Sequence, residues 1–148
     1  MDLSVLGLTS GVPASLGKCA KLKELMLQQN QLEGPIPDEL GQCGELEWLN
    51  LFANQLTGGV PASLGKCAKL KKLVLRTNQL EGPVPDELGQ CGALKWLDLN
   101  TNQLTGGVPA SLGKCAKLKQ LVLWEYQLER RAPSPTSSAS AASWRCSS

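Results

Sequence analysis

The sequence repeats itself with a period of 24 residues over most of its length. Columns of leucine, proline and cysteine carry the period, and the cysteine column is Cys19, Cys43, Cys67, Cys91 and Cys115. A period of 48 is superposed on it, because GVPASLGKCAKLK recurs at Gly11, Gly59 and Gly107, whereas PDELGQCG recurs at Pro37 and Pro85. Units of this length bury their apolar faces only by stacking on their neighbours. The chain is therefore expected to form a solenoid.

Each unit reads LxxLxLxxNxLxGxxPxxLGxC, as in residues 70–91, LKKLVLRTNQLEGPVPDELGQC. The pattern resembles the plant-type subclass of the leucine-rich repeat family, and the resemblance covers residues 1 to about 129. It implies an α/β repeat solenoid, a right-handed superhelix with a concave parallel sheet and short 3-10 or loop segments on the convex side.

The residue pattern supports this geometry by itself. Alternation in LxLxx points Leu25 and Leu27 inward, and it points Met26 and Gln28 outward. The asparagines at the turn after each strand, Asn30, Asn54, Asn78 and Asn102, are expected to form an amide ladder that satisfies backbone groups. Pro and Gly after each strand prevent a long helix from forming.

The cysteines are predicted to form a buried column of reduced thiols, with Cys146 as the exposed one. Cysteines at one position of a solenoid have parallel Cβ directions, which does not suit a disulfide. The chain has no histidine and no CxxC pair, which argues against a zinc site and against most hydrolase and metalloenzyme chemistry. We expect no enzyme activity and no metal or other cofactor.

Charge and hydropathy limit the classes of partner and the compartment expected for this chain. Three of the 15 basic residues, Arg130, Arg131 and Arg145, lie in the last nineteen positions, so the repeats are nearly neutral. Nucleic-acid binding is not expected, because no concentrated basic face is evident. No apolar run suits a membrane span and no secretory signal is recognisable, which leaves the cytoplasm as the default compartment, although a longer parent could be a membrane receptor.

Charged residues at matching positions of neighbouring repeats alternate in sign. Two such columns, Lys21–Glu45–Lys69 and Lys23–Glu47–Lys71, are predicted to form cross-repeat ion pairs on a solvated face. Each pair would contribute about 0 to 1 kcal/mol. The alternation favours stacking in register.

The outward positions of the strands hold the candidate binding residues. Most of the aromatic side chains fall there, next to charged ones, and the leucine positions already fill the core. Aromatic rings beside Arg and Lys are typical of protein-binding hot spots. The candidate set is Trp48, Phe52, Lys72, Arg76, Trp96, Asp98 and Trp124. An alternative interpretation is that the rings lie flat over their neighbours and merely shield the sheet.

Both ends of the array depart from the pattern. Met1 aligns with Leu97, inside a strand, so residues 1–129 are interpreted as an array with incomplete first and last units whose uncapped ends could associate end to end. Residues 130–148 have the composition of a disordered tail. Codons that encode Ala132 to Trp144 can read PVPDELGQCGEL in a shifted frame, so the tail is interpreted as a frame-shifted repeat.

The sequence therefore predicts a non-enzymatic interaction module that binds a protein or peptide on its concave face. The module would be a fragment of a larger receptor-like or scaffold protein. The alternative is a truncated or degenerate repeat product with no selected ligand.

Overall fold

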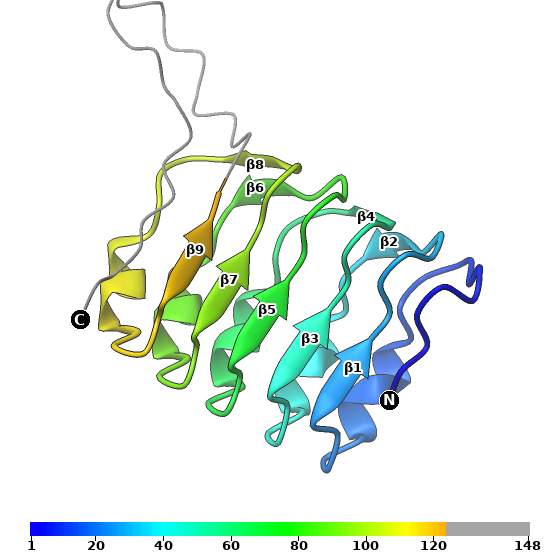
Figure 1. Ribbon diagram of the computed structural model, residues 1–148, viewed down its shortest axis with the longest axis horizontal. Helices are drawn as coiled ribbons and strands as arrows, with labels where there is room; N and C mark the ends of the chain where they lie inside the picture. The colour runs from blue at the N-terminus through cyan, green and yellow to red at the C-terminus, as the bar shows by residue number, and fades with distance from the viewer. Residues whose placement is uncertain (124–148) are drawn as a thin grey trace, which may run out of the picture.

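The structure is a computed structural model that describes residues 1–123, so the predicted tail and Trp124 lie outside the described residues. Five strands form one parallel sheet in the order β1-β3-β5-β7-β9. The strands are β1 (Glu24–Met26), β3 (Trp48–Asn50), β5 (Lys72–Val74), β7 (Trp96–Asp98) and β9 (Gln120–Val122). Figure 1 shows them side by side along the solenoid, in chain order. The parallel-sheet solenoid predicted from the repeat is confirmed.

Five 3-10 helices lie on the opposite, convex side (Figure 1). They are η1 (Ala14–Lys18), η2 (Asp38–Gln42), η3 (Ala62–Lys66), η4 (Asp86–Gln90) and η5 (Ala110–Lys114). Each helix has a proline at its N-cap and the repeat cysteine at its C-cap, as in Pro61 and Cys67 of η3. Because proline has a fixed φ and no N–H, it suits the start of a helix but not its interior. The short convex helices predicted from the sequence are therefore confirmed.

Two smaller parallel sheets follow the concave strands, and the sequence reasoning did not anticipate them. Strand β2 (Glu33–Pro35) pairs with β4 (Gln55–Thr57), and β6 (Glu81–Pro83) pairs with β8 (Gln103–Thr105). These strands overlap the LxG residues of each repeat, such as residues 32–34 and 56–58. Stacking therefore pairs backbone groups at a second position of each turn, which the leucine spacing alone does not reveal.

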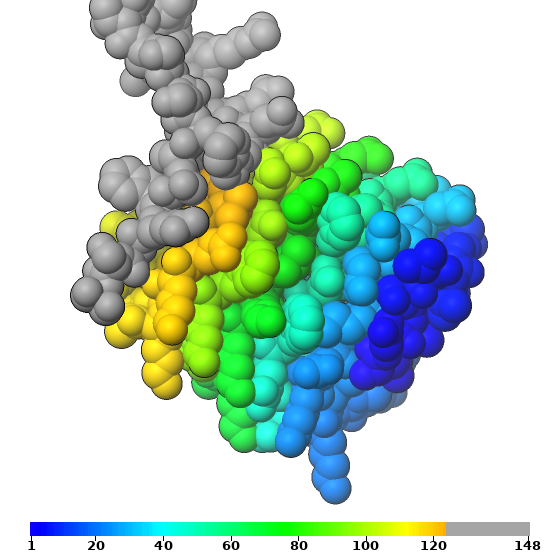
Figure 2. Space-filling model, viewed as in Figure 1, coloured from blue at the N-terminus to red at the C-terminus, as the bar shows by residue number. Residues whose placement is uncertain are grey.

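The core is a set of leucine columns that run through the stack. Leu25, Leu49, Leu73 and Leu97 are aligned in the strand register and are fully buried. Toward the end of the described chain, Leu121 and Leu123 are only half-buried. The space-filling view shows the repeats as parallel bands in close contact (Figure 2). Burial thus depends on having a neighbour on both sides, as expected for a solenoid.

The predicted asparagine ladder is present. Asn54 donates from Nδ2 to the carbonyl oxygens of Leu51 at 3.1 Å and Leu27 at 3.0 Å, and its Oδ1 accepts the N–H of Leu32 at 3.1 Å. One amide therefore satisfies groups of its own repeat and of the preceding one. Leu6 occupies the same position in the first unit and is 61% exposed, since no described repeat precedes it.

The cysteine column follows the prediction except at its first member. Cys43, Cys67, Cys91 and Cys115 are free and buried, and Cys67 Sγ lies 3.5 Å from the carbonyl oxygen of Leu40 in the preceding helix. Cys19 is exposed, so the expectation that all five repeat thiols are buried is wrong for it. The buried thiols contact the preceding helix, and η1 has no described helix before it.

The convex helices approach one another closely at a glycine. A Cβ added to Gly65 of η3 would overlap the carbonyl oxygen of Glu87 in η4, whereas one added to Gly113 of η5 would meet nothing within 4 Å. The difference again reflects whether a described repeat follows. Within residues 1–123, no helix is both long and apolar enough for a bilayer crossing.

Candidate ligand-binding surface

The sheet register places the predicted residues in columns on the concave face. Lys72 lies between Trp48 and Trp96, since β5 pairs with β3 on one side and with β7 on the other. The same register aligns Val74 with Asp98. Neighbouring strands are about 4.8 Å apart, so side chains of one column touch directly. The concave face therefore gathers residues that are 24 positions apart in the sequence.

The first column forms a cation–aromatic stack. Lys72 Nζ lies 4.2 Å from the centroid of the Trp48 ring and 5.9 Å from that of Trp96. Both distances are within the range of attraction between an ammonium group and a ring face. The stack restrains the long lysine side chain and leaves its charge at the surface of the sheet.

A second contact of this kind lies just beyond the strands. Arg76 Cζ lies 4.6 Å from the centroid of the Phe52 ring, while the arginine side chain remains exposed. A guanidinium group stacks well on an aromatic ring and keeps its N–H donors free at the edge. Five of the seven predicted site residues therefore belong to the cation–aromatic stack or to the neighbouring Phe52–Arg76 contact.

Asp98 differs from the other charged site residues because it is buried, with 5% of its surface exposed. Its Oδ1 accepts the N–H of Asn100 at 3.2 Å. Burial raises the pKa of the Asp98 carboxyl above its usual range, and the Asn100 hydrogen bond and the Arg76 charge oppose that rise. When ionised, the Asp98 carboxylate therefore contributes negative electrostatic potential from beneath the surface and is not placed to contact a ligand directly.

The tryptophans are less exposed than the sequence reasoning assumed. Trp48 and Trp96 are half-buried, and the Nε1–H of each is buried without a hydrogen-bond partner among the described residues. Neighbouring side chains of the column cover part of each ring, which the leucine and glycine spacing could not show. Trp124 lies outside the described residues, so its predicted role stays a prediction.

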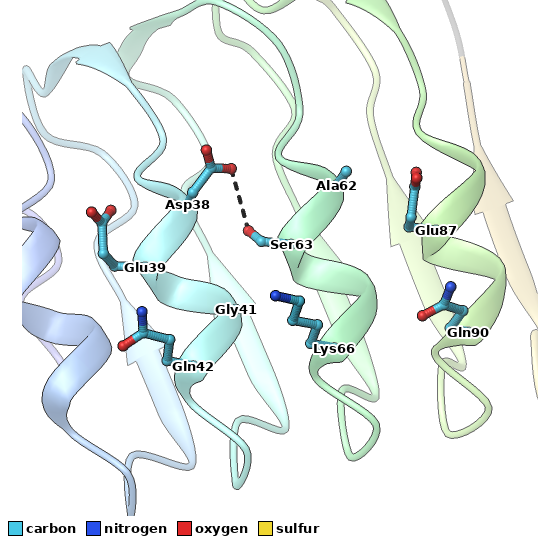
Figure 3. Close-up of a pocket in the computed structure, with 9 residues that line it drawn as sticks. All are labelled: Asp38, Glu39, Gly41, Gln42, Ala62, Ser63, Lys66, Glu87 and Gln90. Atoms are coloured by element: carbon cyan, nitrogen blue, oxygen red, sulfur yellow. Dashed lines mark hydrogen bonds between the residues drawn. The ribbon is translucent and has the colours of Figure 1, made fainter.

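A groove on the convex face was not predicted as a site. It has a volume of about 610 Å³ and is lined by Asp38, Glu39, Gly41, Gln42, Ala62, Ser63, Lys66, Glu87 and Gln90. Figure 3 shows these side chains on η2, η3 and η4, with Ser63 donating from Oγ to Asp38 at 3.4 Å. The 24-residue offset between adjacent helices, with DELGQ and ASLGK alternating, places acidic and basic positions side by side.

The charged columns at the sheet edge are only partly paired. Lys69 contacts Glu45 and Lys71 contacts Glu47, each at 2.6 Å, while Lys21 and Lys23 form no ion pair with a described residue. Residues 1–123 also bring together no three His, Cys, Asp or Glu side chains in a geometry that could hold a metal ion. The chemical features of the concave face are thus stacked cations, aromatic rings and one buried carboxylate.

A parallel-sheet solenoid with such a face belongs to the class of repeat proteins that present an extended concave surface. The Leucine Rich Repeat family profile matches residues 21–43, 45–67, 69–91 and 93–115, so the chain belongs to the leucine-rich repeat family. Its similarity to plant receptors places it in the plant-type subclass.

The chain resembles plant receptors in sequence and in structure. It is 42% identical over 59 residues to the LRR receptor-like serine/threonine-protein kinase GSO2 of Arabidopsis thaliana, a match that covers 39% of this chain and 5% of that protein. The structure of the plant peptide hormone receptor RGFR1 in complex with RGF2 matches with a TM-score of 0.80 and 38% identity, over 81% of this chain and 19% of that one.

A second structural match is the LRR ectodomain of the membrane receptor kinase GASSHO1/SCHENGEN3 from Arabidopsis thaliana, in complex with CASPARIAN STRIP INTEGRITY FACTOR 2. Its TM-score is 0.84 and its identity 40%, over 86% of this chain and 15% of that one. The present chain therefore spans less than a fifth of the length of each of these relatives. What the similarity carries to this chain is the architecture of the leucine-rich-repeat solenoid.

Proposed function

We propose that the chain is a non-enzymatic recognition module that binds a protein or peptide along its concave sheet, within a larger receptor-like or scaffold protein. The observation that carries the proposal is the stack of Trp48, Lys72 and Trp96 across three strands, beside the Phe52–Arg76 contact. The leucine columns already complete the core, so these rings are not required to fill it. Rings and cations of this kind are enriched at protein interfaces.

The similar receptors support the ligand class. RGFR1 is a peptide hormone receptor that was solved with RGF2 bound, and its matching region covers most of this chain. A short solenoid can offer an extended peptide a continuous surface across its strands. A binding role also agrees with the chemistry of the concave face, which offers contacts for a ligand but no set of reacting groups.

A random peptide library panned against the full chain tests the proposal. Selected peptides should lose at least tenfold in affinity when Trp48→Ala and Phe52→Ala are combined, because rings at an interface centre contribute most of the binding free energy. Their binding should change less than twofold in Glu39→Ala with Gln90→Ala, a control on the convex groove. Equal losses in both variants would place binding elsewhere, and a library that yields no specific binder would favour the degenerate-product alternative.

A second proposal concerns self-association through the first unit. An apolar pocket of about 190 Å³ is lined there by leucines such as Leu3, Leu8 and Leu16, and by Thr9, Ser10, Gly11, Pro13, Leu27 and Leu32. We infer that this pocket takes the last described unit of a second copy. Gly41 of η2 packs against Ser63 of the next helix, whereas the equivalent Gly113 of η5 has open space beside it among the described residues. This contact would continue the stack from one copy to the next.

Sedimentation equilibrium of the full chain tests the second proposal. Association should strengthen with concentration and weaken in Leu8→Asp, which puts a charge in the pocket, but not in Leu6→Asp, which alters an exposed side chain outside it. A chain that stays monomeric, or that responds equally to both variants, would contradict end-to-end association.

A further inference from the structure

Positive charge gathers on the later strands of the concave sheet. Residues that directly precede β5, β7 and β9 are all lysines, Lys71, Lys95 and Lys119, and β5 and the residues after it add Lys72 and Arg76. The matching positions of β1 and β3 hold Lys23, Glu24 and Glu47. The face is therefore polarised along the solenoid, near neutral at the first strands and cationic from β5 onward.

Most of these cations have no carboxylate partner in the described chain. Lys71 is paired with Glu47, at 2.6 Å. Lys72, Arg76, Lys95 and Lys119 form no ion pair with any residue in 1–123. Asp98 is the one acidic residue within strands β5, β7 and β9. It is buried, its Oδ1 accepts the N–H of Asn100, and it forms no ion pair with Arg76. The positive charge on these strands is therefore available to a ligand.

The aromatic contacts hold two of these cations in place without neutralising them. A ring face attracts a cation through its quadrupole but carries no net charge. The Trp48 and Phe52 rings, at 4.2 Å and 4.6 Å, thus restrict Lys72 and Arg76 to the concave surface. Restraint before binding lowers the entropy that a ligand contact must overcome. The two side chains are separated by four positions along an extended chain, about 13 Å apart at their backbones.

The same column carries an excess of hydrogen-bond donors. The Trp48 and Trp96 Nε1–H groups have no acceptor in the described chain, and the ammonium group between their rings has no acceptor either. The two indole N–H groups lie beneath the surface, and Gln28 Oε1 is a buried unpartnered acceptor among the described residues, so the donor placed to meet a ligand is the Lys72 ammonium group over the rings. Carboxylates supply acceptors and the matching charge together.

We propose that the concave face recognises an acidic peptide segment, whose aspartate or glutamate carboxylates lie over β5 to β9 and are selected by Lys72 and Arg76. This inference rests on the proposed function and adds the chemical class of the ligand and two specificity-determining residues. The near-neutral strands β1 and β3 would hold the uncharged part of the same segment.

Fluorescence anisotropy with two labelled twelve-residue peptides tests the inference. One peptide alternates aspartate with serine and glycine, and the other has asparagine at each aspartate. The full chain should bind the acidic peptide at least tenfold more tightly. Lys72→Met keeps an apolar chain against the tryptophans and removes the charge, and it should weaken that binding at least fivefold, as should Arg76→Gln. Lys72→Arg keeps the charge and should retain most of it.

Lys114→Met is the matched control, because it removes the same charge from an exposed position on η5. It should change the affinity for the acidic peptide less than twofold. Equal binding of both peptides, or equal losses in Lys72→Met and Lys114→Met, would overturn the inference. Equally tight, Lys72-dependent binding of a twelve-nucleotide single-stranded DNA would also overturn it, since the face would then select anions in general.

Failure here is distinguishable from failure of the proposed function. If library-selected peptides depend on Trp48 and Phe52 but carry no excess of acids and ignore Lys72→Met, the binding module stands and its acidic specificity is wrong. If selected peptides do not depend on Trp48 and Phe52, the module itself is wrong.

Discussion

The buried columns and the concave columns of this solenoid treat the 24-residue period differently. The core column is leucine in every repeat, with Leu25, Leu49, Leu73 and Leu97 buried and Leu121 half-buried, and the convex helices alternate strictly between ASLGK and DELGQ. The concave column Glu24, Trp48, Lys72, Trp96 and Gln120 changes residue type at every step. A core position must fit the same neighbours in the repeats before and after it, so it tolerates one residue type. A position facing outward tolerates several. Variation within a regular stack thus identifies the surface available for recognition.

The largest effect is expected where the stack is tightest. Gly65→Val should lower the free energy of unfolding by about 3 kcal/mol or more, because the new side chain overlaps the Glu87 carbonyl of the next helix. Gly113→Val places the same residue at the equivalent site of η5, where nothing lies within 4 Å, and should cost little. Urea unfolding followed by circular dichroism measures both. Similar losses would mean that helix contact between repeats is not what requires glycine.

A loss of about 2 to 3 kcal/mol is expected from Asn54→Ala, because it leaves several buried backbone groups of two repeats without partners. Asn100→Ala removes the same amide from the concave side, where Oδ1 accepts only the exposed Thr101 hydroxyl, and should cost under about 1 kcal/mol. Urea midpoints of the two variants compare them. A larger loss for Asn100→Ala than for Asn54→Ala would show that the asparagine ladder is not the main source of this stability.

The buried thiols predict how stability depends on pH. Burial, with the neighbouring thiols, raises the pKa of Cys67 from 9.0 to about 11 and that of Cys91 to about 12. Between pH 9 and 11 the unfolded chain releases these protons and the folded chain keeps them, so the free energy of unfolding falls as pH rises. Each thiol contributes about 1.4 kcal/mol per pH unit.

Cys67→Ala should therefore make the slope of unfolding free energy against pH shallower by about that amount. Cys19→Ala removes an exposed thiol and is the control. Denaturant melts at several pH values from 8 to 11 provide the slopes. An unchanged slope in Cys67→Ala would show that this thiol is not protected by the stack.

The smallest effect is expected on the concave face, with the opposite sign. Asp98→Asn should raise the free energy of unfolding at pH 7 by about 1 kcal/mol, because it removes a buried charge that has no ion-pair partner within residues 1–123. Since burial raises the Asp98 pKa above 3.8, wild-type stability falls as pH rises through the interval between 3.8 and that raised pKa.

The gain of Asp98→Asn should accordingly appear at pH 7 and shrink at pH 3, where the native carboxyl is protonated. Asp86→Asn, on the exposed convex helix η4, is the matched control. Thermal melts at the two pH values test it. A loss of stability in Asp98→Asn at pH 7 would mean that the carboxylate supports the fold and is not kept for binding.

The sequence by itself determined the stack. The leucine, asparagine and cysteine columns are local in the repeat, and the period repeats each local requirement in the neighbour. The solenoid and the ladder could therefore be predicted from spacing, and the resemblance of the motif to the leucine-rich repeat family implied the concave parallel sheet. The same period aligned Trp48, Lys72 and Trp96, which made the concave candidates visible before the structure. The column logic was wrong for Cys19, since a position within a repeat says nothing about whether a preceding helix covers it. It was also wrong for Lys21 and Lys23, which form no ion pair with a described residue.

Only the tertiary structure decided how the outward side chains lie. Spacing places Lys72 between two tryptophans, but the choice of rotamer sets its ammonium over both rings. It also leaves the two indole N–H groups buried without a partner in the part of the chain that the structure describes. Likewise, the pairing of Lys71 with Glu47, while Lys23 makes no ion pair with a described residue, depends on side-chain geometry that a column of charges does not specify. Backbone register follows from a repeating pattern, whereas burial and charge compensation arise from contacts between residues that differ from one repeat to the next.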